Sequence, residues 1–369
     1  MPAGLCFFAM GPAVARVVHF WHPYTLEKFI TKSTKLTGKS LLVTGGTGTL
    51  GLAILRHLLE KEEFEKIILF SRDEMKQWAL RQHFGDEPRL RFFIGDVRDR
   101  DRLKRAFAGV DYVVHAAATK IVPAAEYNPF EAVKTNILGA MNVAEAAVDM
   151  GVESVVALST DKASSPINLY GATKLVSDKL FLRSSTYMAS ELTRFNVLRY
   201  GNIIGSRGSL IPSIRGQVVS GKPVEVTDPE MTRFMQKVER AVVAVLGLLV
   251  SESRSETHIL KSPSMKVGDI VSVLASGSEV RITGERSGEK KHEQMLSEHD
   301  VPYSVEMADK FVRYETPDRA TNAVAMSLGQ GLASGFSYAS NSNDAWMTTE
   351  ELSSYLASLD EKNLFPAPL

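Results

Sequence analysis

A single cysteine, Cys6, occurs among the 369 residues of the sequence. One thiol cannot form an internal disulfide framework or a cysteine-based metal site, and it fits a reducing compartment. An excess of either charge is also lacking, because 43 Lys and Arg residues balance 43 Asp and Glu residues. A neutral chain has no general attraction to nucleic acid or to anionic membranes, so we expect neither as a partner. The eight histidines form no HExxH motif, and we predict no metal site.

Long hydrophobic runs are scarce as well. The apolar stretch GLCFFAMGPAVA at residues 4–15 is shorter than a bilayer requires, and Arg16 and His19 follow it closely. No basic residue precedes it, as a secretory signal would need. We therefore interpret residues 1–35 as an N-terminal extension rather than a signal or an anchor, and we expect a cytoplasmic protein.

The sequence does contain a regular alternation of short apolar runs with segments of helical periodicity. Predicted helices lie at residues 52–61 and 130–151, the second ending at Gly151. Predicted strands lie at residues 41–43, 66–71, 90–97, 111–118, 154–160 and, with a following loop, 195–205. This alternation predicts an α/β fold, a Rossmann-type doubly wound parallel sheet with helices on both faces.

The pattern loosens after Gly205, where Gly, Pro and Ser cluster. Residues 238–250 read as a helix, and residues 258–277 combine a strand with a helix. We predict that residues 36–204 form an NADP-binding Rossmann domain. Residues 205–369 are then mainly a smaller substrate-binding lobe that closes over the sheet, with some segments returning to the sheet.

The first predicted strand and helix are joined by a TGxxGxxG motif that begins at Thr44. Glycines at these spacings allow a tight strand-to-helix turn and a close approach of the backbone to a pyrophosphate at the helix N-terminus. The position of the motif at the start of the alternating pattern distinguishes it from a merely tight turn. The cofactor contacts predicted here are Gly45, Thr47, Gly48, Thr49, Leu50 and Gly51.

The end of the second predicted strand favours NADP over NAD. An acidic residue at this point usually binds the ribose diol of NAD, but here Ser71 and Arg72 stand there, with Lys76 one turn later. A guanidinium is a good partner for a 2′-phosphate. Asp73 and Glu74 leave open the alternative that a carboxylate reaches a ribose hydroxyl.

Two later strand ends complete the predicted cofactor site. Asp96 and Val97 follow the third strand and would lie beside the adenine. Ala116 and Ala117 on the fourth strand are small enough to let the nicotinamide half lie close.

Residues 159–174, STDKASSPINLYGATK, contain a Tyr170-xxx-Lys174 motif after the fifth strand. Residues four apart are neighbours on a helix, so the Lys174 ammonium and a nicotinamide cation are expected to lower the tyrosine pKa. Tyr170 would then remove a proton from a sugar hydroxyl while hydride leaves the same carbon, with Thr160 as the accompanying hydroxyl. This is similar to the extended short-chain dehydrogenase/reductase pattern.

The same segment holds an acid and a base, Asp161 and Lys162, that simple oxidation does not require. After C4 of a sugar becomes a ketone, the C5 proton is acidic. A base can then remove it while an acid helps the C6 hydroxyl to leave, and the hydride returns to C6. The pair therefore indicates a 4,6-dehydration, although a solvated loop ion pair is the alternative.

The segment resembles that of the inverting UDP-N-acetylglucosamine 4,6-dehydratases, lyases of polysaccharide and pseudaminic acid biosynthesis. The resemblance covers roughly residues 36–357 and includes HAAATK, EYNPFEAVKTNILGAMNV, RYGNIIGSRGSLIP, DPEMTRFM and SGEKKHEQML. It implies that Lys162 removes the C5 proton, that Asp161 protonates the leaving C6 hydroxyl, and that Tyr170 is the C4 base, steadied by Lys174. Ile121, Met235 and Ser287 depart from the family pattern without touching this proton chemistry.

The resemblance also implies a UDP-sugar as substrate, NADP as cofactor and a homo-oligomer. The residues that it places in the nucleotide-sugar site are Lys120, Lys162, Asn202, Arg207, Arg233 and Glu289, with Asn202 also at the cofactor beside Tyr170 and Lys174. Two alternatives stay open from the residues alone. A UDP-hexose 4-epimerase would use Tyr170 and leave Asp161 and Lys162 idle, and a non-catalytic NADP-sensing protein could share the fold.

Overall fold

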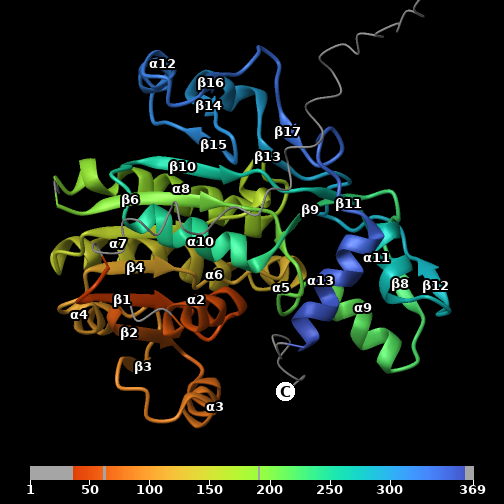
Figure 1. Ribbon diagram of the computed structural model, residues 1–369, viewed down its shortest axis with the longest axis horizontal. Helices are drawn as coiled ribbons and strands as arrows, with labels where there is room; N and C mark the ends of the chain where they lie inside the picture. The colour runs from red at the N-terminus through yellow and green to blue at the C-terminus, as the bar shows by residue number, and fades with distance from the viewer. Residues whose placement is uncertain (1–35, 61–63, 190–191, 362–369) are drawn as a thin grey trace, which may run out of the picture. The chain divides into compact units, whose positions relative to one another are not determined.

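The computed structural model describes residues 36–60, 64–189 and 192–361, which Figure 1 shows as helices and strands. The predicted extension, residues 1–35, and Cys6 within it lie outside the described residues. No helix of the described part is long and apolar enough to cross a membrane.

A ten-stranded sheet runs through the centre of the described chain. Its strands are β1 (Lys39–Thr44), β2 (Phe64–Ser71), β3 (Leu90–Ile94), β4 (Tyr112–His115), β5 (Ser154–Leu158), β6 (Arg194–Arg199), β10 (Glu256–Leu260), β14 (Ser304–Glu306), β15 (Lys310–Arg313) and β16 (Gln330–Gly331). The order is β16-β14-β15-β10-β6-β5-β4-β1-β2-β3, and the seven strands from β3 to β10 are parallel. The order reverses between β1 and β4, where ligands bind in such sheets. The predicted fold class is confirmed.

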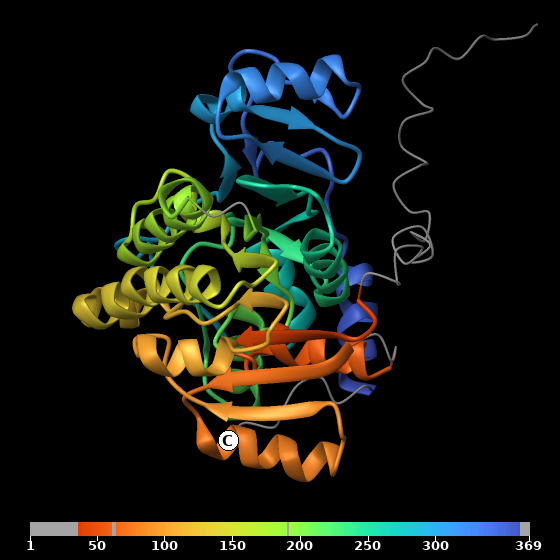
Figure 2. The same cartoon turned by 90° about the vertical axis from the view of Figure 1, so that its left-hand side faces the viewer.

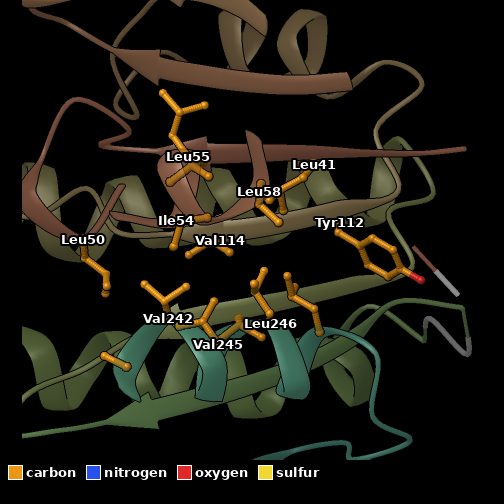
Figure 3. Packing of buried hydrophobic residues seen from close by; sticks show 14 of the residues in the cluster. Leu41, Leu50, Ile54, Leu55, Leu58, Tyr112, Val114, Val242, Val245 and Leu246 are labelled. Carbon is orange, nitrogen blue, oxygen red and sulfur yellow. The ribbon is translucent and has the colours of Figure 1, made fainter. Parts of the chain in front are cut away.

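Helices cover both faces of this sheet, as Figure 2 shows from the side. On one face lie α2 (Thr49–Leu59) and α10 (Val238–Leu249), and on the other lie α4 (Arg100–Phe107), α7 (Gly139–Asp149) and α8 (Leu169–Tyr187). In Figure 3, Val242 and Val245 of α10 point toward Ile54 of α2 and Val114 of β4. Burying each such side chain stabilises the fold by about 1.5–3 kcal/mol. Successive side chains of each strand pack against opposite faces of the sheet, so both faces are covered by helices.

The helix predicted at 130–151 is interrupted. It consists of α6 (Pro129–Val133), a π-helical turn η2 (Lys134–Leu138) and α7, and it ends at Asp149. Gly151 follows with a φ of 71°, which suits a residue just after a helix end. A π-turn offsets the residues around it, and this one brings Asn136 against helix α8.

The central sheet and its covering helix α10 take up some of the chain after residue 200, and several other segments gather at the end toward which the parallel strands point in Figure 1. They form three small sheets, β11-β9-β7, β12-β8 and β13-β17. Their bounds are β7 (Asn202–Ile203), β8 (Val224–Val226), β9 (Thr232–Gln236), β11 (Ser264–Lys266), β12 (Val280–Ile282), β13 (Gln294–Leu296) and β17 (Tyr338–Ala339). A separate hydrophobic cluster joins α9 (Leu210–Val219), α11 (Val267–Leu274) and α13 (Thr349–Glu361). The remaining helices are α3 (Glu74–Phe84), α5 (Val122–Tyr127), η3 (Asp161–Ala163), η4 (Glu298–Tyr303) and α12 (Pro317–Ala325).

Candidate active site

The glycine loop between β1 and α2 packs so closely on neighbouring backbone that side chains at two of its positions would not fit. Gly45 has a φ of 67°, and a Cβ there would lie 2.8 Å from the backbone nitrogen of Ala117. A Cβ on Gly51 would lie 2.5 Å from the carbonyl oxygen of Gly46, so the helix packs directly on the loop. No described side chain caps α2 at Gly48, and its first turn contains no acidic residue. These residues fit the pyrophosphate of a dinucleotide at a helix N-terminus.

Arg207 lies against this glycine loop. Its guanidinium donates to the carbonyl oxygen of Thr47, and its backbone N–H donates to Thr49 Oγ1 at 3.1 Å. Leu50, predicted as a cofactor contact, has its side chain in the hydrophobic core. Arg207 was predicted to contact the sugar nucleotide, yet its hydrogen bonds are to the predicted cofactor loop.

The polar side chains after β2 are largely engaged with one another. Ser71 is buried, and its hydroxyl accepts a hydrogen bond from Gln77 Nε2 at 2.9 Å. Asp73 caps α3 by accepting from the backbone of Lys76 at 2.9 Å, and it also pairs with the Lys76 ammonium at 2.6 Å. Hydrogen bonding to Lys76 lowers the pKa of Asp73. Asp73 is therefore engaged within its own helix rather than held toward a ribose.

Arg72 extends from the same loop, with 59% of its side chain exposed and Nη1 3.7 Å from Asp96 Oδ2. Asp96 also accepts two hydrogen bonds from the guanidinium of Arg98, at 2.9 and 2.6 Å. Burial favours a higher pKa for Asp96, but the Arg98 hydrogen bonds outweigh it and lower the pKa. The side chain of Val97 packs in the core, which leaves only its backbone for a contact outside the core.

The end of β4 is ordered by Thr44. Its carbonyl oxygen accepts from the N–H of Ala116 at 3.1 Å, and its hydroxyl accepts from the N–H of Ala117 at 3.3 Å. The hydroxyl also lies 2.9 Å from His115 Nδ1. Burial, with a smaller contribution from the Lys174 charge, lowers the pKa of His115 to about 3, so the ring is neutral. The two predicted alanines thus form a fixed wall beside the glycine loop.

The proton-handling residues after β5 sit on the short helix η3. Thr160 caps this helix and donates from its hydroxyl to Asp161 Oδ1 at 2.8 Å. Lys162 Nζ donates to the same Asp161 oxygen at 3.2 Å and to Glu293 Oε1 at 2.8 Å. Only 1% of the Asp161 side chain is exposed. Asp161 is buried, and Lys162, with 21% of its side chain exposed, is partly buried, which distinguishes the pair from a fully solvated loop ion pair.

The charge state of Lys162 follows from these two carboxylates. Burial favours the neutral amine, but the charges of Asp161 and Glu293 outweigh burial and raise the pKa of Lys162 above its ordinary value. Lys162 therefore rests as an ammonium, and it must pass on a proton before it can act as a base.

Tyr170 and Lys174 lie one turn apart on α8, and both are buried. Burial raises the pKa of Tyr170 to about 12, while the Lys162 ammonium and a hydrogen bond with Thr160 oppose this rise. Burial also lowers the pKa of Lys174, partly offset by Asp178. The sequence predicted that Lys174 lowers the tyrosine pKa below its ordinary value. In the protein alone that pKa is raised, and Lys162 is the largest opposing charge, because it lies in the same buried cluster.

Asn136 was not predicted as a site residue. Its amide donates to Thr173 Oγ1 at 3.0 Å and to the carbonyl of Thr119 at 2.9 Å, and its Oδ1 accepts from the N–H of Thr119 at 2.8 Å. Asn136 thus joins the loop after β4 to the helix that carries Tyr170. Only the π-turn brings it there, and the apolar period of the helix gives no signal for such a turn.

Glu293 was also missed, and it belongs to a segment, residues 288–294, that contacts the loop after β5. The hydrogen bonds between them are Asn168 Nδ2 to the Gly288 carbonyl (2.7 Å), Lys290 Nζ to the Ser164 carbonyl (2.7 Å), Ser165 Oγ to Gln294 Oε1 (3.0 Å) and Lys162 Nζ to Glu293 Oε1 (2.8 Å). The 288–294 segment therefore fixes the loop after β5 from a part of the chain far away in sequence.

Arg233 and Glu289 are brought together as an ion pair of 3.2 Å. Arg233 is buried on β9 and also donates to the carbonyls of Thr232 and Lys291, at 2.9 and 3.1 Å. Asn202 lies next to this strand, on β7. These three predicted substrate residues therefore share one small sheet and the segment that leads to Glu293.

Lys120, another predicted substrate residue, lies in the loop after β4. It retains solvent-accessible surface, yet burial of its surroundings lowers its pKa, and the charge of Arg207 lowers it further. Lys120 and Arg207 thus form a local positive region in a chain of zero net charge. No group of three or more His, Cys, Asp or Glu residues in the described chain could hold a metal ion.

Comparisons with known proteins agree with this arrangement. The sequence profile of a family described as "Polysaccharide biosynthesis protein" matches residues 41–315. An inverting UDP-N-acetylglucosamine 4,6-dehydratase of Campylobacter jejuni is 45% identical over 85% of this chain and 96% of its own length. A UDP-glucose 4-epimerase of Rickettsia canadensis is 39% identical over 74% of this chain and 82% of its own length. The crystal structure of Pen from Bacillus thuringiensis superposes with a TM-score of 0.80 at 34% identity, covering 89% of this chain and 99% of that one.

Proposed function

This chain belongs to the polysaccharide biosynthesis protein family, and we propose that it is an inverting UDP-N-acetylglucosamine 4,6-dehydratase. The observation that carries the proposal is the ion pair of the partly buried Lys162 with the buried Asp161, beside Tyr170. Oxidation at C4 requires only the tyrosine, whereas elimination across C5 and C6 requires both a base and an acid. The product would be a UDP-4-keto-6-deoxy-N-acetylhexosamine with inverted C5.

The proposed cofactor is a nicotinamide dinucleotide, and within that class NADP. The glycine loop and the N-terminus of α2, which has no side-chain cap and no acidic residue in its first turn, support dinucleotide binding. The exposed guanidinium of Arg72 supports a 2′-phosphate, and the engagement of Asp73 with Lys76 disfavours a ribose contact by that carboxylate. When bound, the nicotinamide supplies the acceptor and later the donor of one hydride.

The chain's own residues handle the protons. Tyr170 takes the proton of the C4 hydroxyl, and the positive charge of Lys162 favours the phenolate that this role needs. A proton moved from Lys162 Nζ to Asp161 Oδ1, over 3.2 Å, converts the resting ion pair into a neutral amine and a carboxylic acid. The amine then takes the C5 proton, and the acid protonates the C6 hydroxyl, which leaves as water. The ion pair is restored.

The proposed sugar-nucleotide site lies around Arg233, Glu289 and Asn202, and Lys120 in the loop after β4 is proposed as a further contact. A UDP-sugar brings two phosphates, and buried or partly buried cations are needed to offset their charge. Arg233 is a buried cation whose Nε lies 4.0 Å from the Glu293 oxygen that accepts from Lys162, so it adjoins the proposed acid–base cluster. We place Arg207 between the two ligands, because its hydrogen bonds are to the glycine loop. The cytoplasmic location, the homo-oligomeric state and the domain division remain predictions from the sequence.

A UDP-hexose 4-epimerase is the second candidate, because a relative of that name is 39% identical. The decisive experiment incubates the protein with UDP-N-acetylglucosamine in deuterated water and analyses products by mass spectrometry and NMR. The proposed dehydratase gives a product lighter by one water, with deuterium and inverted configuration at C5. A product of unchanged mass, inverted only at C4 and without deuterium at C5, would establish the epimerase instead.

A further inference from the structure

We propose that Glu293 is a positioning residue for the C5 step, holding Lys162 Nζ in place and stabilising the ammonium that forms there. The inference rests on the proposed function, because it concerns the proton that Lys162 takes from C5. It assigns a role to a residue that lies 131 positions from its partner in the sequence.

The geometry around Glu293 is that of a fixed, buried carboxylate. Only 1% of the residue is exposed, and its Oε1 lies 2.8 Å from Lys162 Nζ. Its backbone is held on both sides by Ser340, whose hydroxyl accepts from the Glu293 N–H and whose N–H donates to the Glu293 carbonyl. Neither Glu293 Oε2 nor Asp161 Oδ2 has a hydrogen-bond partner among the described residues. Buried carboxylate oxygens without partners are costly, and such features concentrate at functional sites.

The C5 step creates charge where Glu293 can act on it. The lone pair of the Lys162 amine forms an N–H bond as the C5–H bond breaks, and the C–H electron pair remains in the enolate of the 4-keto sugar. One positive charge therefore appears on Nζ, 2.8 Å from Glu293 Oε1, while Glu293 itself gains no proton. A carboxylate fixed before the reaction stabilises such a charge without reorganisation.

Other charged and titratable groups also face Lys162. Asp161 lies on the same loop, Tyr170 on α8, Arg233 on β9, and Lys290 on the 288–294 segment that carries Glu293. Arg233 Nε lies 4.0 Å from the Glu293 oxygen that accepts from Lys162, so part of the carboxylate charge is offset by the guanidinium. Glu293 thus links the residue proposed to bind the nucleotide with the residue proposed to take the C5 proton.

The test substitutes Glu293→Gln, which retains an oxygen acceptor for Lys162 and removes the charge. We expect C5 exchange with deuterated solvent to slow by about 10²-fold. Reduction of the cofactor and the KM for UDP-N-acetylglucosamine should stay within about twofold, because Tyr170 and Arg233 are untouched. Loss of a negative neighbour lowers the Lys162 pKa, so the rise of C5 exchange with pH should begin at lower pH.

Glu293→Asp and Glu306→Gln are the comparison variants. Glu293→Asp keeps the negative charge. C5 exchange should therefore begin to rise at the same pH as in the wild type, although its rate should be slower. Glu306→Gln breaks a Lys–Glu pair of similar length, 2.7 Å to Lys261, at a distance from the site, and should change none of these quantities. If Glu293→Gln does not fold, Glu293→Asp carries the test alone, and a raised KM or a lost hydride step in it overturns the proposal.

A second measurement requires no turnover. The rate at which an amine reagent labels Lys162, followed by mass spectrometry across a pH series, reports its neutral fraction. Glu293→Gln should move the labelling profile to lower pH, and an unchanged profile overturns the proposal. If the profile moves while the wild-type protein neither dehydrates UDP-N-acetylglucosamine nor exchanges its C5 proton, the proposed function fails. The interaction by which Glu293 raises the pKa of Lys162 is still supported in that case.

Discussion

The side-chain amide of Asn136 donates a hydrogen bond to Thr173 Oγ1 at 3.0 Å, which fastens the π-turn to the helix that carries Tyr170 and Lys174. Asn136→Ala leaves the N–H and carbonyl of Thr119 without this partner as well. Each buried polar group left unpaired costs about 1–3 kcal/mol. We expect a lower free energy of unfolding in urea and, because Tyr170 shifts, a slower hydride step per folded molecule. Asn196→Ala removes a buried amide bonded to the backbone elsewhere, and it should reduce stability without slowing that step.

Substitutions at Tyr170 and at Lys162 should affect different steps of the proposed reaction. Tyr170→Phe is expected to abolish hydride removal, because the C4 hydroxyl loses its base. Lys162→Met is expected to keep hydride removal and to reduce dehydration by about 10²–10⁴-fold. Single-turnover absorbance of the reduced cofactor, together with product analysis, separates the two steps. Near-normal dehydration by Lys162→Met would remove this lysine from the chemistry.

Lys162→Met also makes a pH prediction. The Lys162 ammonium opposes the burial that raises the pKa of Tyr170 to about 12. Without that charge the phenolate is less stable, so the rise of hydride removal with pH should shift to higher pH. The measurement is the initial rate of cofactor reduction over a pH series. If the rate of cofactor reduction begins to rise at lower pH, or at the same pH as in the wild type, the electrostatic link between Lys162 and Tyr170 is contradicted.

Arg207 and Arg233 should affect different ligands. Arg207→Ala removes a guanidinium that donates to the glycine loop, so we expect dinucleotide affinity to fall by about tenfold. Arg233→Ala should instead raise the KM for the UDP-sugar and spare dinucleotide affinity. Titration calorimetry with the dinucleotide and steady-state kinetics with the sugar nucleotide measure the two effects. Equal losses of both ligands in both variants would mean that neither arginine has a separate role.

Arg72→Ala tests the choice of cofactor. Loss of a guanidinium–phosphate pair should weaken NADP binding by about 10–100-fold and leave NAD binding unchanged. Arg81→Ala, on the same helix region but exposed away from β2, is the matched control. The wild-type protein should also release NADP on denaturation, and release of NAD alone would count against the strand-end interpretation.

His115 predicts how stability depends on pH. Its pKa is lowered from an ordinary value of 6.5 to about 3 by burial and by Lys174, so folding excludes its proton. The contribution of His115 to the free energy of unfolding is fully present above about pH 6.5. It is lost as the pH falls toward 3, by up to about 1.4 kcal/mol per pH unit. His115→Gln should therefore show a shallower fall in the free energy of unfolding between about pH 6.5 and about pH 4. His299→Gln, at a side chain that is 89% exposed, should follow the wild type.

The sequence predicted the residues that lie close together along the chain. Asp161, Lys162, Tyr170 and Lys174 share one short segment, and a strand followed by a helix turn is enough to bring them together. Glu293 could not be found this way, because it meets Lys162 only through pairing of the 288–294 segment with the catalytic loop. Asn136 was missed since a π-turn depends on tertiary hydrogen bonds rather than on local propensity.

The central sheet likewise contains strands that the sequence predicted and strands that it did not. The six strands predicted from residue 41 to residue 205 are apolar runs between helices, and all of them are present. β14, β15 and β16 have three, four and two residues, too short to show an alternating pattern. Their place in the sheet is determined by antiparallel pairing with β10 and with one another, which no local stretch specifies.

The pairing of β6 with β10 sets an order of events during synthesis. β6 ends at Arg199, but the strand that covers its open edge begins only at Glu256. While the intervening chain is being made, the peptide groups along this edge have no partner within the sheet, and unpaired edges recruit strands from other molecules. The nascent chain is therefore most exposed to intermolecular pairing between the emergence of β6 and that of β10. Slow translation across that interval lengthens the exposure, and a chaperone that covers the edge of β6 shortens it.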